Sequence, residues 1–465
     1  MKESKISKSI PSSFRDPSGF LFSRDSKIFR QINTVYRENY LHLMRSGLYE
    51  SLVERKLLIP HKEVSTEPLR SDTAYKIIQP EGIPFVSYPY EWCFSQLKSA
   101  ALTTLKIQKV ALDFGMSLKD CSAYNIQFRK GKPVFIDTLS FEKYRAGQPW
   151  IAYRQFCQHF FAPLALMCYG DIRLNKLLMI HIDGIPLDLA SRLLSFADRL
   201  KPALFFHIYL HSKSQKFFGN KNINTKNWRL SRHSFLGLID SLESAVKKLV
   251  WKPQSTQWTA YYKNTDYSQE AFDHKKKLVS LFLDKINPAD AWDLGANTGT
   301  FSRIAGKRGI QVFSFDADPA VVEKNYLKCV DENEENILPL LLDLTNPSPD
   351  IGWQNRERIA FMKRGPADTV LALALVHHLA ISNNIPLDKI AGFFNNICDR
   401  LIIEFVPKSD SQVQRFLSSR TDIFPNYTKQ AFENAFGRYF AIRDCVKIKG
   451  SQRTLHLMEK QKPDQ

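Results

Sequence analysis

Features of secreted and membrane proteins are scarce in this sequence. Its seven cysteines include no Cys-x-x-Cys pair, so we expect reduced thiols, with neither a disulfide framework nor a bound metal. The longest nearly unbroken apolar stretches, 160–169 and 369–381, are shorter than the ~20 residues that cross a bilayer. The N-terminus, MKESKISKSIPSS, has no apolar segment followed by a cleavage site. We therefore predict a cytoplasmic protein without a signal peptide.

Acidic residues are under-represented in the first half of the chain. Residues 1–250 contain 37 Lys and Arg against 21 Asp and Glu, and residues 251–465 contain 28 against 26, so the first half carries most of the net charge of +18. Segment 199–239 has no acidic residue, and its basic side chains are interleaved with aromatic ones. This pattern suits a polyanionic partner such as RNA, and it suits a solvated basic surface over an aromatic core equally well.

The second half contains a segment with the pattern of a strand, a glycine turn, a helix and a second strand, Ala291 to Pro319. Gly295 and Gly299 let the backbone approach a ligand and adopt positive φ, and Asn297 between them tolerates the left-handed region. Asp316 ends the second strand, 17 residues beyond Gly299, where a carboxylate can accept hydrogen bonds from both hydroxyls of a ribose. The segment therefore predicts a nucleotide-like cofactor over the turn.

The turn lacks the third glycine of the GxGxxG fingerprint, which disfavours a dinucleotide cofactor. Asp293 precedes the first glycine, at the carboxyl end of the predicted first strand. A carboxylate at this point suits a cation better than a pyrophosphate. Because S-adenosylmethionine carries an ammonium and a sulfonium, we favour it over NAD as the cofactor.

The same segment resembles motif I of class I S-adenosylmethionine-dependent methyltransferases in its D-x-G-x-N-x-G form, and later segments follow in the family's order. The resemblance implies a Rossmann-like α/β sheet that ends in an antiparallel strand pair. It places Asp343, in the third strand, near the adenine amino group, and it makes Tyr267 and Lys275 candidate cofactor contacts, although Tyr267 suits a packing role equally well. The matching segments are LLLDL (340–344), ADTVLALALVHHLAI (367–381), LIIEF (401–405), FAIRDCVKI (440–448) and TLHLMEK (454–460).

Methyl transfer from a sulfonium chiefly needs proximity and orientation, with a base where the acceptor must lose a proton. The candidates for that base are His377 and His378, at the end of the predicted fourth strand, and Glu404, at the end of the fifth. Either histidine suits capping or packing of the following helix at least as well. The fourth strand is not followed by the Asn/Asp-Pro-Pro-aromatic stretch of nucleobase amino methyltransferases, which disfavours that class of enzyme.

A second pattern lies in the first half. Asp120, Asn125 and Asp137, with a Lys-Gly turn between two strands, resemble the catalytic loop and metal-binding acid of the protein-kinase-like fold. A glycine-rich loop is lacking, and Arg30 stands where a strand lysine is expected. We therefore predict a kinase-like domain that is inactive as a kinase, with an α+β accessory domain as the alternative. The expected elements are a hairpin over 20–32, a helix over 40–57, strands near 75–78 and 84–87, a hinge at 88–92 and a helix over 94–114.

The domain organisation predicted from these patterns is an α+β kinase-like domain over 1–145, a helical basic extension over 146–250 and a methyltransferase domain over 251–465. The whole chain resembles a group of bacterial two-part methyltransferases that includes nodulation-type proteins. The resemblance implies O-methylation of a glycan, a lipid-linked saccharide or a related metabolite. We expect the basic half to grip phosphate or diphosphate groups, and the sequence leaves peripheral membrane contact open. The alternatives are an RNA-directed methyltransferase, a bifunctional kinase and methyltransferase, and a module that senses S-adenosylmethionine.

Overall fold

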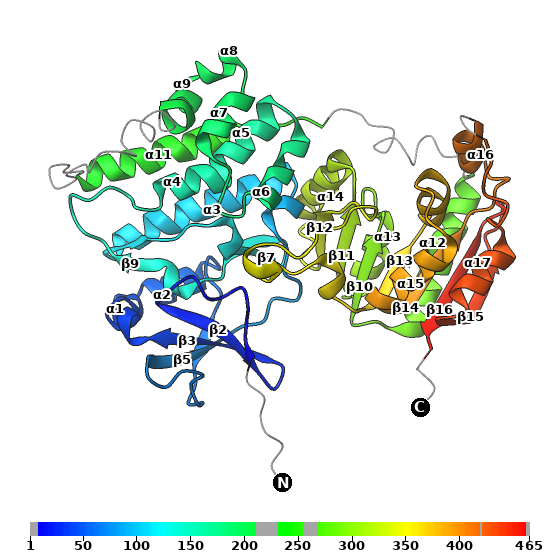
Figure 1. Ribbon diagram of the computed structural model, residues 1–465, viewed down its shortest axis with the longest axis horizontal. Helices are drawn as coiled ribbons and strands as arrows, with labels where there is room; N and C mark the ends of the chain where they lie inside the picture. Colours follow the sequence, from blue (N-terminus) through cyan, green and yellow to red (C-terminus); the bar gives the residue numbers. More distant parts are fainter. Residues whose placement is uncertain (1–7, 211–230, 254–267, 419–420, 462–465) are drawn as a thin grey trace, which may run out of the picture. The chain divides into compact units, whose positions relative to one another are not determined.

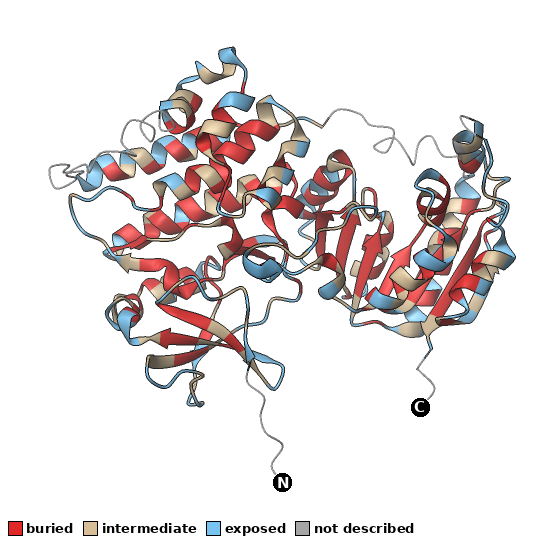
Figure 2. Cartoon of the chain, viewed as in Figure 1, coloured by how far each residue is buried: buried red, intermediate tan, exposed pale blue. Residues whose placement is uncertain are grey.

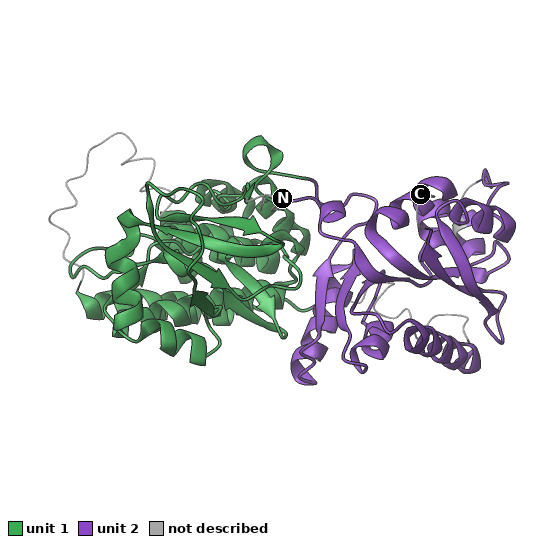
Figure 3. Ribbon diagram, turned by 90° about the horizontal axis from the view of Figure 1, so that it is seen from below, with its two compact units in different colours: residues 1–252, 350–358 green, residues 253–349, 359–465 purple. Residues whose placement is uncertain are grey.

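The structure, a computed structural model, describes residues 8–210, 231–253, 268–418 and 421–461. The chain divides into two compact units, coloured separately in Figure 3. Unit 1 consists of Met1–Lys252 and Asp350–Arg358, and unit 2 of Pro253–Pro349 and Ile359–Gln465. In the part of the chain that the structure describes, no helix has both the length and the apolar character needed to cross a membrane.

The short segment Asp350–Arg358 belongs to unit 1 although it interrupts the sequence of unit 2. Two contacts within unit 1 hold it. Arg15 donates a hydrogen bond of 2.7 Å to Glu357, and the guanidinium carbon of Arg358 lies 4.1 Å from the ring centroid of Tyr124. The Glu357 side chain is only 2% exposed and its partner Arg15 is 51% exposed, so the segment is anchored by a buried carboxylate paired with a half-exposed guanidinium.

Unit 1 begins with an antiparallel sheet of five strands in the order β1-β2-β3-β5-β4 (Figure 1). Its central hairpin turns at Asp25 and Ser26, which both have positive φ. Three phenylalanines of the hairpin pack with Ile77 in one hydrophobic cluster, so the alternating pattern of the hairpin buries one face of the sheet. The elements are β1 (Lys8–Ser9), β2 (Gly19–Arg24), β3 (Lys27–Asn33), η1 (Thr34–Tyr36), α1 (Arg37–Arg45), α2 (Leu48–Glu54), β4 (His61–Glu63) and β5 (Ala74–Pro80).

The remainder of unit 1 is mainly helical. Its longest helix, α3 (Phe94–Asp113), is buried over most of its length, and the side chain of Gln96 accepts a hydrogen bond from the backbone of Cys93 at its start. Two short antiparallel strand pairs follow, β6 with β9 and, between them in the chain, the hairpin of β7 and β8. The other elements are η2 (Pro89–Glu91), β6 (Met116–Leu118), η3 (Ala123–Asn125), β7 (Ile126–Arg129), β8 (Lys132–Phe135), η4 (Thr138–Ser140), β9 (Phe141–Lys143), α4 (Tyr153–Phe156), η5 (Cys157–Phe161), α5 (Ala162–Tyr169), η6 (Ile172–Lys176), α6 (Leu177–Ile180), α7 (Leu187–Leu193), α8 (Phe196–Arg199), α9 (Pro202–Leu204), η7 (Phe205–Leu210) and α11 (Arg232–Lys248).

Most elements predicted for the first half form where they were expected. The hairpin over 20–32, the strand near 75–78 and the helix over 94–114 are confirmed. The helix predicted over 40–57 is broken at Gly47, whose φ of +84° separates α1 from α2. The strand predicted near 84–87 is wrong. The side-chain amide of Gln127 binds both the N–H and the carbonyl of Ser87, each at 2.9 Å, in place of a neighbouring strand.

Unit 2 is built on a seven-stranded sheet in the order β12-β11-β10-β13-β14-β16-β15. Strands β10 to β14 are parallel, and β16 pairs antiparallel with both β14 and β15. The mixed α/β sheet with a terminal antiparallel pair that the sequence predicted is therefore confirmed. The strands are β10 (Asp290–Leu294), β11 (Gln311–Asp316), β12 (Ile337–Leu341), β13 (Ala367–Ala372), β14 (Cys398–Phe405), β15 (Phe440–Lys447) and β16 (Thr454–Lys460).

Helices cover the sheet of unit 2, and its strands are buried along most of their length except the edge strand β15, which has one buried residue (Figure 2). Helix α12 starts at Ser268, whose hydroxyl accepts the N–H of Ala271 at 3.1 Å, and it shares one hydrophobic cluster with the central strands. The apolar stripe of this amphipathic helix is thereby removed from water. The helices are α12 (Gln269–Ile286), α13 (Thr300–Gly306), α14 (Pro319–Asp331), η10 (Trp353–Asn355), η11 (Phe361–Lys363), η12 (His378–Ser382), α15 (Leu387–Ile397), α16 (Ser411–Ser418) and α17 (Lys429–Phe436), with η10 in the segment that belongs to unit 1.

Candidate functional site

A pocket of unit 2 lies beyond the carboxyl ends of β10, β11 and β13, the edge at which open α/β sheets bind ligands. Its cavity volume is about 270 Å³. The lining is largely apolar, and acidic side chains follow the strand ends. Among the predicted cofactor residues, Asp293, Gly295, Asn297, Asp316 and Asp343 line the pocket, and Gly299 does not.

A side chain is disfavoured at each of the two glycines of the turn for a different structural reason. Gly295 has a φ of +75°, and a Cβ added there would meet only Leu375, at 3.4 Å, so its bare backbone leaves open space in the pocket. Gly299 has a φ of +78°, and a Cβ there would lie 2.3 Å from the Asn325 side chain. Gly299 therefore permits close packing behind the turn, whereas Gly295 keeps the pocket open.

Asp316 is positioned at the end of β11 by two backbone donors. The N–H of Asn297 donates to one carboxylate oxygen at 2.8 Å, and the N–H of Asp318 donates to the other at 3.0 Å. Burial raises the pKa of Asp316 to about 6. Each oxygen retains a further acceptor site, so the carboxylate can still accept two hydrogen bonds from a ligand.

Asp293 is a buried carboxylate at the end of β10, only 2% exposed. The hydroxyl of Ser302 donates to it at 2.6 Å, and that hydroxyl lies 3.0 Å from the hydroxyl of Ser314. Burial raises the pKa of Asp293 to about 6. Because desolvation penalises the charged form, a ligand cation placed next to Asp293 would stabilise the carboxylate. Ser302 is a partner that the sequence did not single out, since nothing in the motif aims its hydroxyl at β10.

Asp343 follows β12 rather than ending it. The third strand was predicted over 340–344, but β12 spans Ile337–Leu341 because the chain turns away from the sheet after Leu342 donates to the carbonyl of Asp316. The Asp343 carboxylate caps the next turn, accepting hydrogen bonds from the N–H and the hydroxyl of Thr345 at 2.9 and 2.6 Å. It remains part of the pocket lining. Tyr267 lies outside the described residues.

The two candidate histidines occupy different environments. His378 lines the pocket at the first residue of η12, and burial lowers its pKa to about 4. His377 is 1% exposed, does not line the pocket, and has its pKa lowered well below the usual value by burial. Their ring centroids are 4.2 Å apart. Both imidazoles are therefore neutral near pH 7, and of the two only His378 lines the pocket.

Glu404 is a fully buried carboxylate with protein partners on both oxygens. The ammonium of Lys275 donates to one oxygen at 2.5 Å, and so does the backbone N–H of Ala374, at 2.8 Å. The guanidinium of Arg453 reaches the other oxygen at 3.5 Å and also pairs with Asp410. Glu404 is absent from the pocket lining, whereas Lys275 contributes to it. The placement favours a role for Glu404 in positioning Lys275 and the loop after β13.

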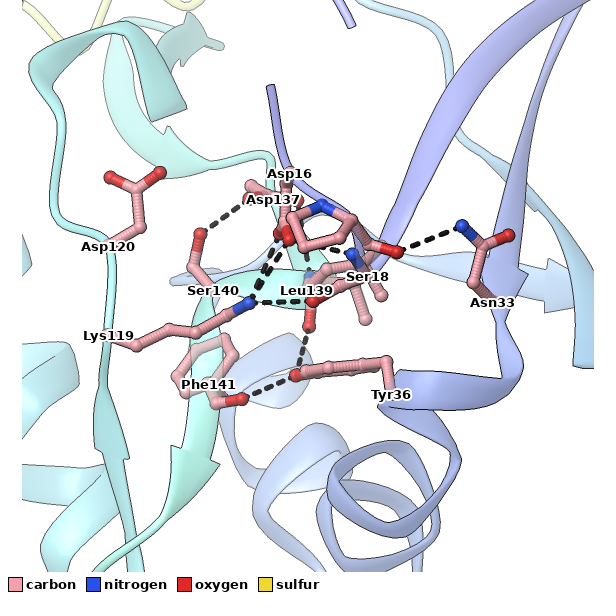
Figure 4. A network of polar contacts seen from close by, with 12 residues as sticks. Asp16, Ser18, Asn33, Tyr36, Lys119, Asp120, Asp137, Leu139, Ser140 and Phe141 are labelled. Carbon is pink, nitrogen blue, oxygen red and sulfur yellow. Dashed lines mark hydrogen bonds and ion pairs between the residues drawn. The ribbon is translucent and has the colours of Figure 1, made fainter. Parts of the chain in front are cut away.

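Unit 1 brings together Asp120, Asn125 and Asp137, the three residues of the kinase-like pattern; Figure 4 shows Asp120 and Asp137. Asp137 begins η4 and accepts hydrogen bonds from the hydroxyl of Ser140 at 2.5 Å and from the N–H of Leu139 at 3.2 Å. Asn125 donates to the same Ser140 hydroxyl at 3.4 Å. Asp120 accepts from the N–H of Ser122 and the amide of Gln155, and burial raises its pKa.

A protein cation already neutralises this cluster. The guanidinium of Arg30, on β3, forms an ion pair with Asp137. Burial is the largest single influence and raises the pKa of Asp137, but the charge of Arg30 and the hydrogen bonds from Ser140, Leu139 and Arg30 together outweigh it, so the pKa of that carboxyl is lowered. A carboxylate whose oxygen is taken by a guanidinium does not fit the oxygen-ligand shell of Mg²⁺. These residues as placed therefore do not form a magnesium and nucleotide site.

A second ion pair closes the neighbouring loop. Lys119 binds the carboxylate of Asp16 at 3.2 Å and the hydroxyl of Ser18 at 2.8 Å, and the hydroxyl of Tyr36 donates to the carbonyl of Phe141 at 2.6 Å (Figure 4). These contacts tie the segment before β2 to Lys119, which follows β6, and tie Tyr36 of η1 to β9, the strand that follows Asp137 and η4. The cluster is thus internally satisfied, as a structural network would be. Of the basic segment 199–239, residues 211–230 lie outside the described residues.

Comparisons with known proteins give one relative along nearly the whole chain. No protein-family model matches. Nodulation protein NoeA of Rhizobium meliloti (strain 1021) is 35% identical over 459 residues, which cover 97% of this chain and 96% of that protein. Identity at this level over this length defines a family, although the name of that protein states no reaction.

Solved structures match only part of the chain. The PH0226 protein of Pyrococcus horikoshii OT3 has a TM-score of 0.32 and 16% identity, over 43% of this chain and 98% of that one. The magnesium protoporphyrin IX methyltransferase ChlM of Synechocystis PCC 6803, solved with bound SAH, has a TM-score of 0.32 and 16% identity, over 44% and 93%. WbdD with the kinase inhibitor LY294002 has a TM-score of 0.28 and 11% identity, over 40% of each chain. Scores of this size assign no function.

Proposed function

The chain belongs to the family of nodulation protein NoeA, and from that premise and the pocket of unit 2 we propose that it is an S-adenosylmethionine-dependent methyltransferase. The observation that carries the proposal is the pair of enclosed carboxylates, Asp293 and Asp316, at the ends of adjacent parallel strands. Both line one apolar pocket, and the backbone of Gly295 lies bare beside them. An apolar cavity with a few convergent acids suits a cationic nucleoside better than a pyrophosphate.

The residues of the pocket fit this cofactor group by group. Asp316 has two acceptor sites left for the two hydroxyls of a ribose. Asp293, with its raised pKa, gains from a neighbouring ammonium or sulfonium. Asp343, which lines the pocket, would accept a hydrogen bond from the amino group of the adenine. The apolar surface for the base comes from Phe315, Leu342 and Leu379.

When bound, the cofactor supplies a methyl group on a sulfonium, which is already activated for in-line displacement. The chain then has to orient the acceptor, exclude water and remove a proton from an acceptor hydroxyl. We assign the last role to His378, because its neutral imidazole lines the pocket. Glu404 holds Lys275 and the N–H of Ala374 in place, which makes it a positioning residue.

The acceptor class that we propose is an anionic saccharide or lipid-linked saccharide methylated on oxygen. Support comes from the excess of basic residues in 1–250 and from the relative named for nodulation. For unit 1 we propose a kinase-like architecture without phosphotransfer. Support comes from the order of its elements, from the grouping of Asp120, Asn125 and Asp137, and from the Arg30 guanidinium on Asp137.

Affinity for S-adenosylmethionine is expected to fall below about pH 6. A cationic ligand with ribose hydroxyls prefers the ionised forms of Asp293 and Asp316, so their pKa values drop from about 6 on binding. Binding should be independent of pH above pH 7 and weaken by about tenfold per carboxyl at pH 5, where only about one tenth of each is ionised in the free protein. Isothermal titration calorimetry of the full chain between pH 5 and pH 8 measures both the affinity and the proton released.

The control for this experiment is Asp316→Asn, which keeps the shape and a carbonyl acceptor but removes one titrating group. Its binding should be weaker than that of the wild type at pH 7.5, and at pH 5 to 6, where the wild type releases protons on binding, it should release about half as many. If the folded wild-type chain binds neither S-adenosylmethionine nor S-adenosylhomocysteine at any of these pH values, the proposed function is wrong.

Replacing the two histidines one at a time is expected to show that His378 affects the rate of methyl transfer and that His377 affects the stability of the fold. His378→Ala should lower the initial rate of methyl transfer by about 10²- to 10⁴-fold, the usual contribution of a general base, with little change in the melting temperature. His377→Ala should instead lower the melting temperature, because it removes a side chain that is 1% exposed. The rate is measured with labelled S-adenosylmethionine and extracted bacterial saccharide and lipid fractions. An undiminished rate in His378→Ala would remove this histidine from the reaction.

A further inference from the structure

Three potential metal ligands of different chemistry meet in unit 2, away from the cofactor pocket: Glu433 on α17, Cys445 on β15 and His456 on β16. None of the three lines that pocket. We propose that they form a binding site for a zinc-class divalent metal ion, with a fourth coordination position open to water. This site is independent of the proposed methyl transfer.

The distances between the three ligand atoms match one face of a coordination tetrahedron. Zinc binds nitrogen and carboxylate oxygen at ~2.0 Å and sulfur at ~2.3 Å, which places tetrahedral ligand atoms ~3.3–3.6 Å from one another. The Nε2 atom of His456 lies 3.1 Å from a carboxylate oxygen of Glu433 and 3.3 Å from the sulfur of Cys445. The sulfur lies 3.8 Å from the same oxygen. A single ion can therefore contact all three atoms after shifts of a few tenths of an ångström.

The register of the terminal strands creates this grouping. Cys445 and His456 are directly opposite in the antiparallel pair β15 and β16, so their side chains are on the same face of the sheet. Helix α17 supplies Glu433 above them, and the ring centroid of Phe432 lies 5.2 Å from that of His456. His456 is fully buried, Glu433 is half-buried and Cys445 is exposed. The imidazole of His456 is thus fixed by packing, and the side of the site at Cys445 faces solvent.

The charges around the site are compatible with a cation. Besides the three ligands, the charged group that faces the cluster is Lys429, whose ammonium is 3.5 Å from Glu433 and next to the Cys445 thiol. Its side chain is 45% exposed and can turn into solvent. A thiolate and a carboxylate together balance a divalent ion, and binding releases the thiol proton. The mixed sulfur, nitrogen and oxygen donor set favours zinc over magnesium or calcium.

The expected result is one equivalent of metal bound per chain through these three side chains. The full chain is reduced, stripped with a chelator and titrated with Co²⁺ as an optical probe and then with Zn²⁺ as a competitor. Wild type should show a thiolate-to-cobalt charge-transfer band that saturates at one equivalent and disappears when Zn²⁺ is added. Zn²⁺ should also raise the melting temperature, because the ion joins α17 to the two strands. Mg²⁺ should do neither.

Two variants and a control make the test specific. Cys445→Ser removes an exposed ligand, so the chain should fold normally and lose both the charge-transfer band and the stabilisation by Zn²⁺. Glu433→Gln should weaken Co²⁺ binding by tenfold or more. Cys168→Ser, at a partly buried thiol of unit 1, should leave both signals unchanged. The proposal is overturned if wild type shows no saturable Co²⁺ band, or if the band survives in Cys445→Ser.

Discussion

The Gly295→Arg variant is expected to lose all measurable binding of S-adenosylmethionine, whereas Gly295→Ala should keep most of it. The two variants share the same backbone cost, since any L-residue at a φ of +75° is strained by about 1–2 kcal/mol. They differ in volume and charge. An alanine Cβ meets only Leu375, at the ordinary contact distance of 3.4 Å. An arginine side chain would extend into a cavity of about 270 Å³ and place its guanidinium beside Asp293 and Asp316, where the cofactor's cation and ribose would otherwise lie.

Calorimetric titration of both variants at pH 7.5, together with thermal unfolding, separates the two effects. Similar melting temperatures for the two variants would show that both have the same backbone strain at position 295. Retained binding in Gly295→Arg would place the cofactor outside this pocket and would refute the site. Loss of binding in both variants would point to the backbone conformation of the turn rather than to the space above it.

The second large effect is expected from two lysines of the same helix. Lys275→Met should reduce the free energy of unfolding of unit 2 by about 3–5 kcal/mol, because it leaves the buried carboxylate of Glu404 without its nearest cation. Lys285→Met should cost about 0–1 kcal/mol. Both lysines are on α12 and both form an ion pair of 2.5 Å, with Glu404 and Asp444 respectively. The side chains of Lys275 and Lys285 are 4% and 57% exposed, so comparing the two variants measures how burial changes the contribution of an ion pair to the free energy of unfolding.

Urea unfolding monitored by tryptophan fluorescence measures both losses on one scale. The double variant Lys275→Met with Glu404→Leu should recover part of the stability lost by Lys275→Met alone, since it removes the uncompensated charge. Arg453 then still pairs with Asp410. Equal losses for Lys275→Met and Lys285→Met would contradict the idea that desolvation governs the network around Glu404.

Local patterns in the sequence were sufficient to predict the sheet of unit 2 and most of the residues that line its pocket. The strands, the turn with Gly295, Asn297 and Gly299, and the acids at the ends of β10 and β11 occupy contiguous segments. Their geometry depends on backbone torsion and hydrophobic periodicity, which short windows of sequence encode. For the same reason the hairpin of β2 and β3 and the long helix α3 form where their patterns predict.

Strand ends and isolated extended runs were less predictable. β12 ends before Asp343 because the chain leaves the sheet once its last hydrogen bond to β11 is made. Residues 84–87 form no strand because a side chain, that of Gln127, satisfies the backbone of Ser87. Both outcomes depend on partners distant in the chain, which a local pattern does not contain.

By itself, then, the sequence determined the order of most elements, the contrast between a basic first half and a second half with a glycine turn, and the acids near the ends of β10 and β11. Only the tertiary structure decided how buried charges are paired. It placed Arg30 on Asp137, Lys275 and Arg453 on Glu404, and Cys445 beside His456 and Glu433. The physical reason is that a buried charge or ligand needs a partner at contact distance, and contact distance is set by sheet register and helix packing rather than by spacing along the chain.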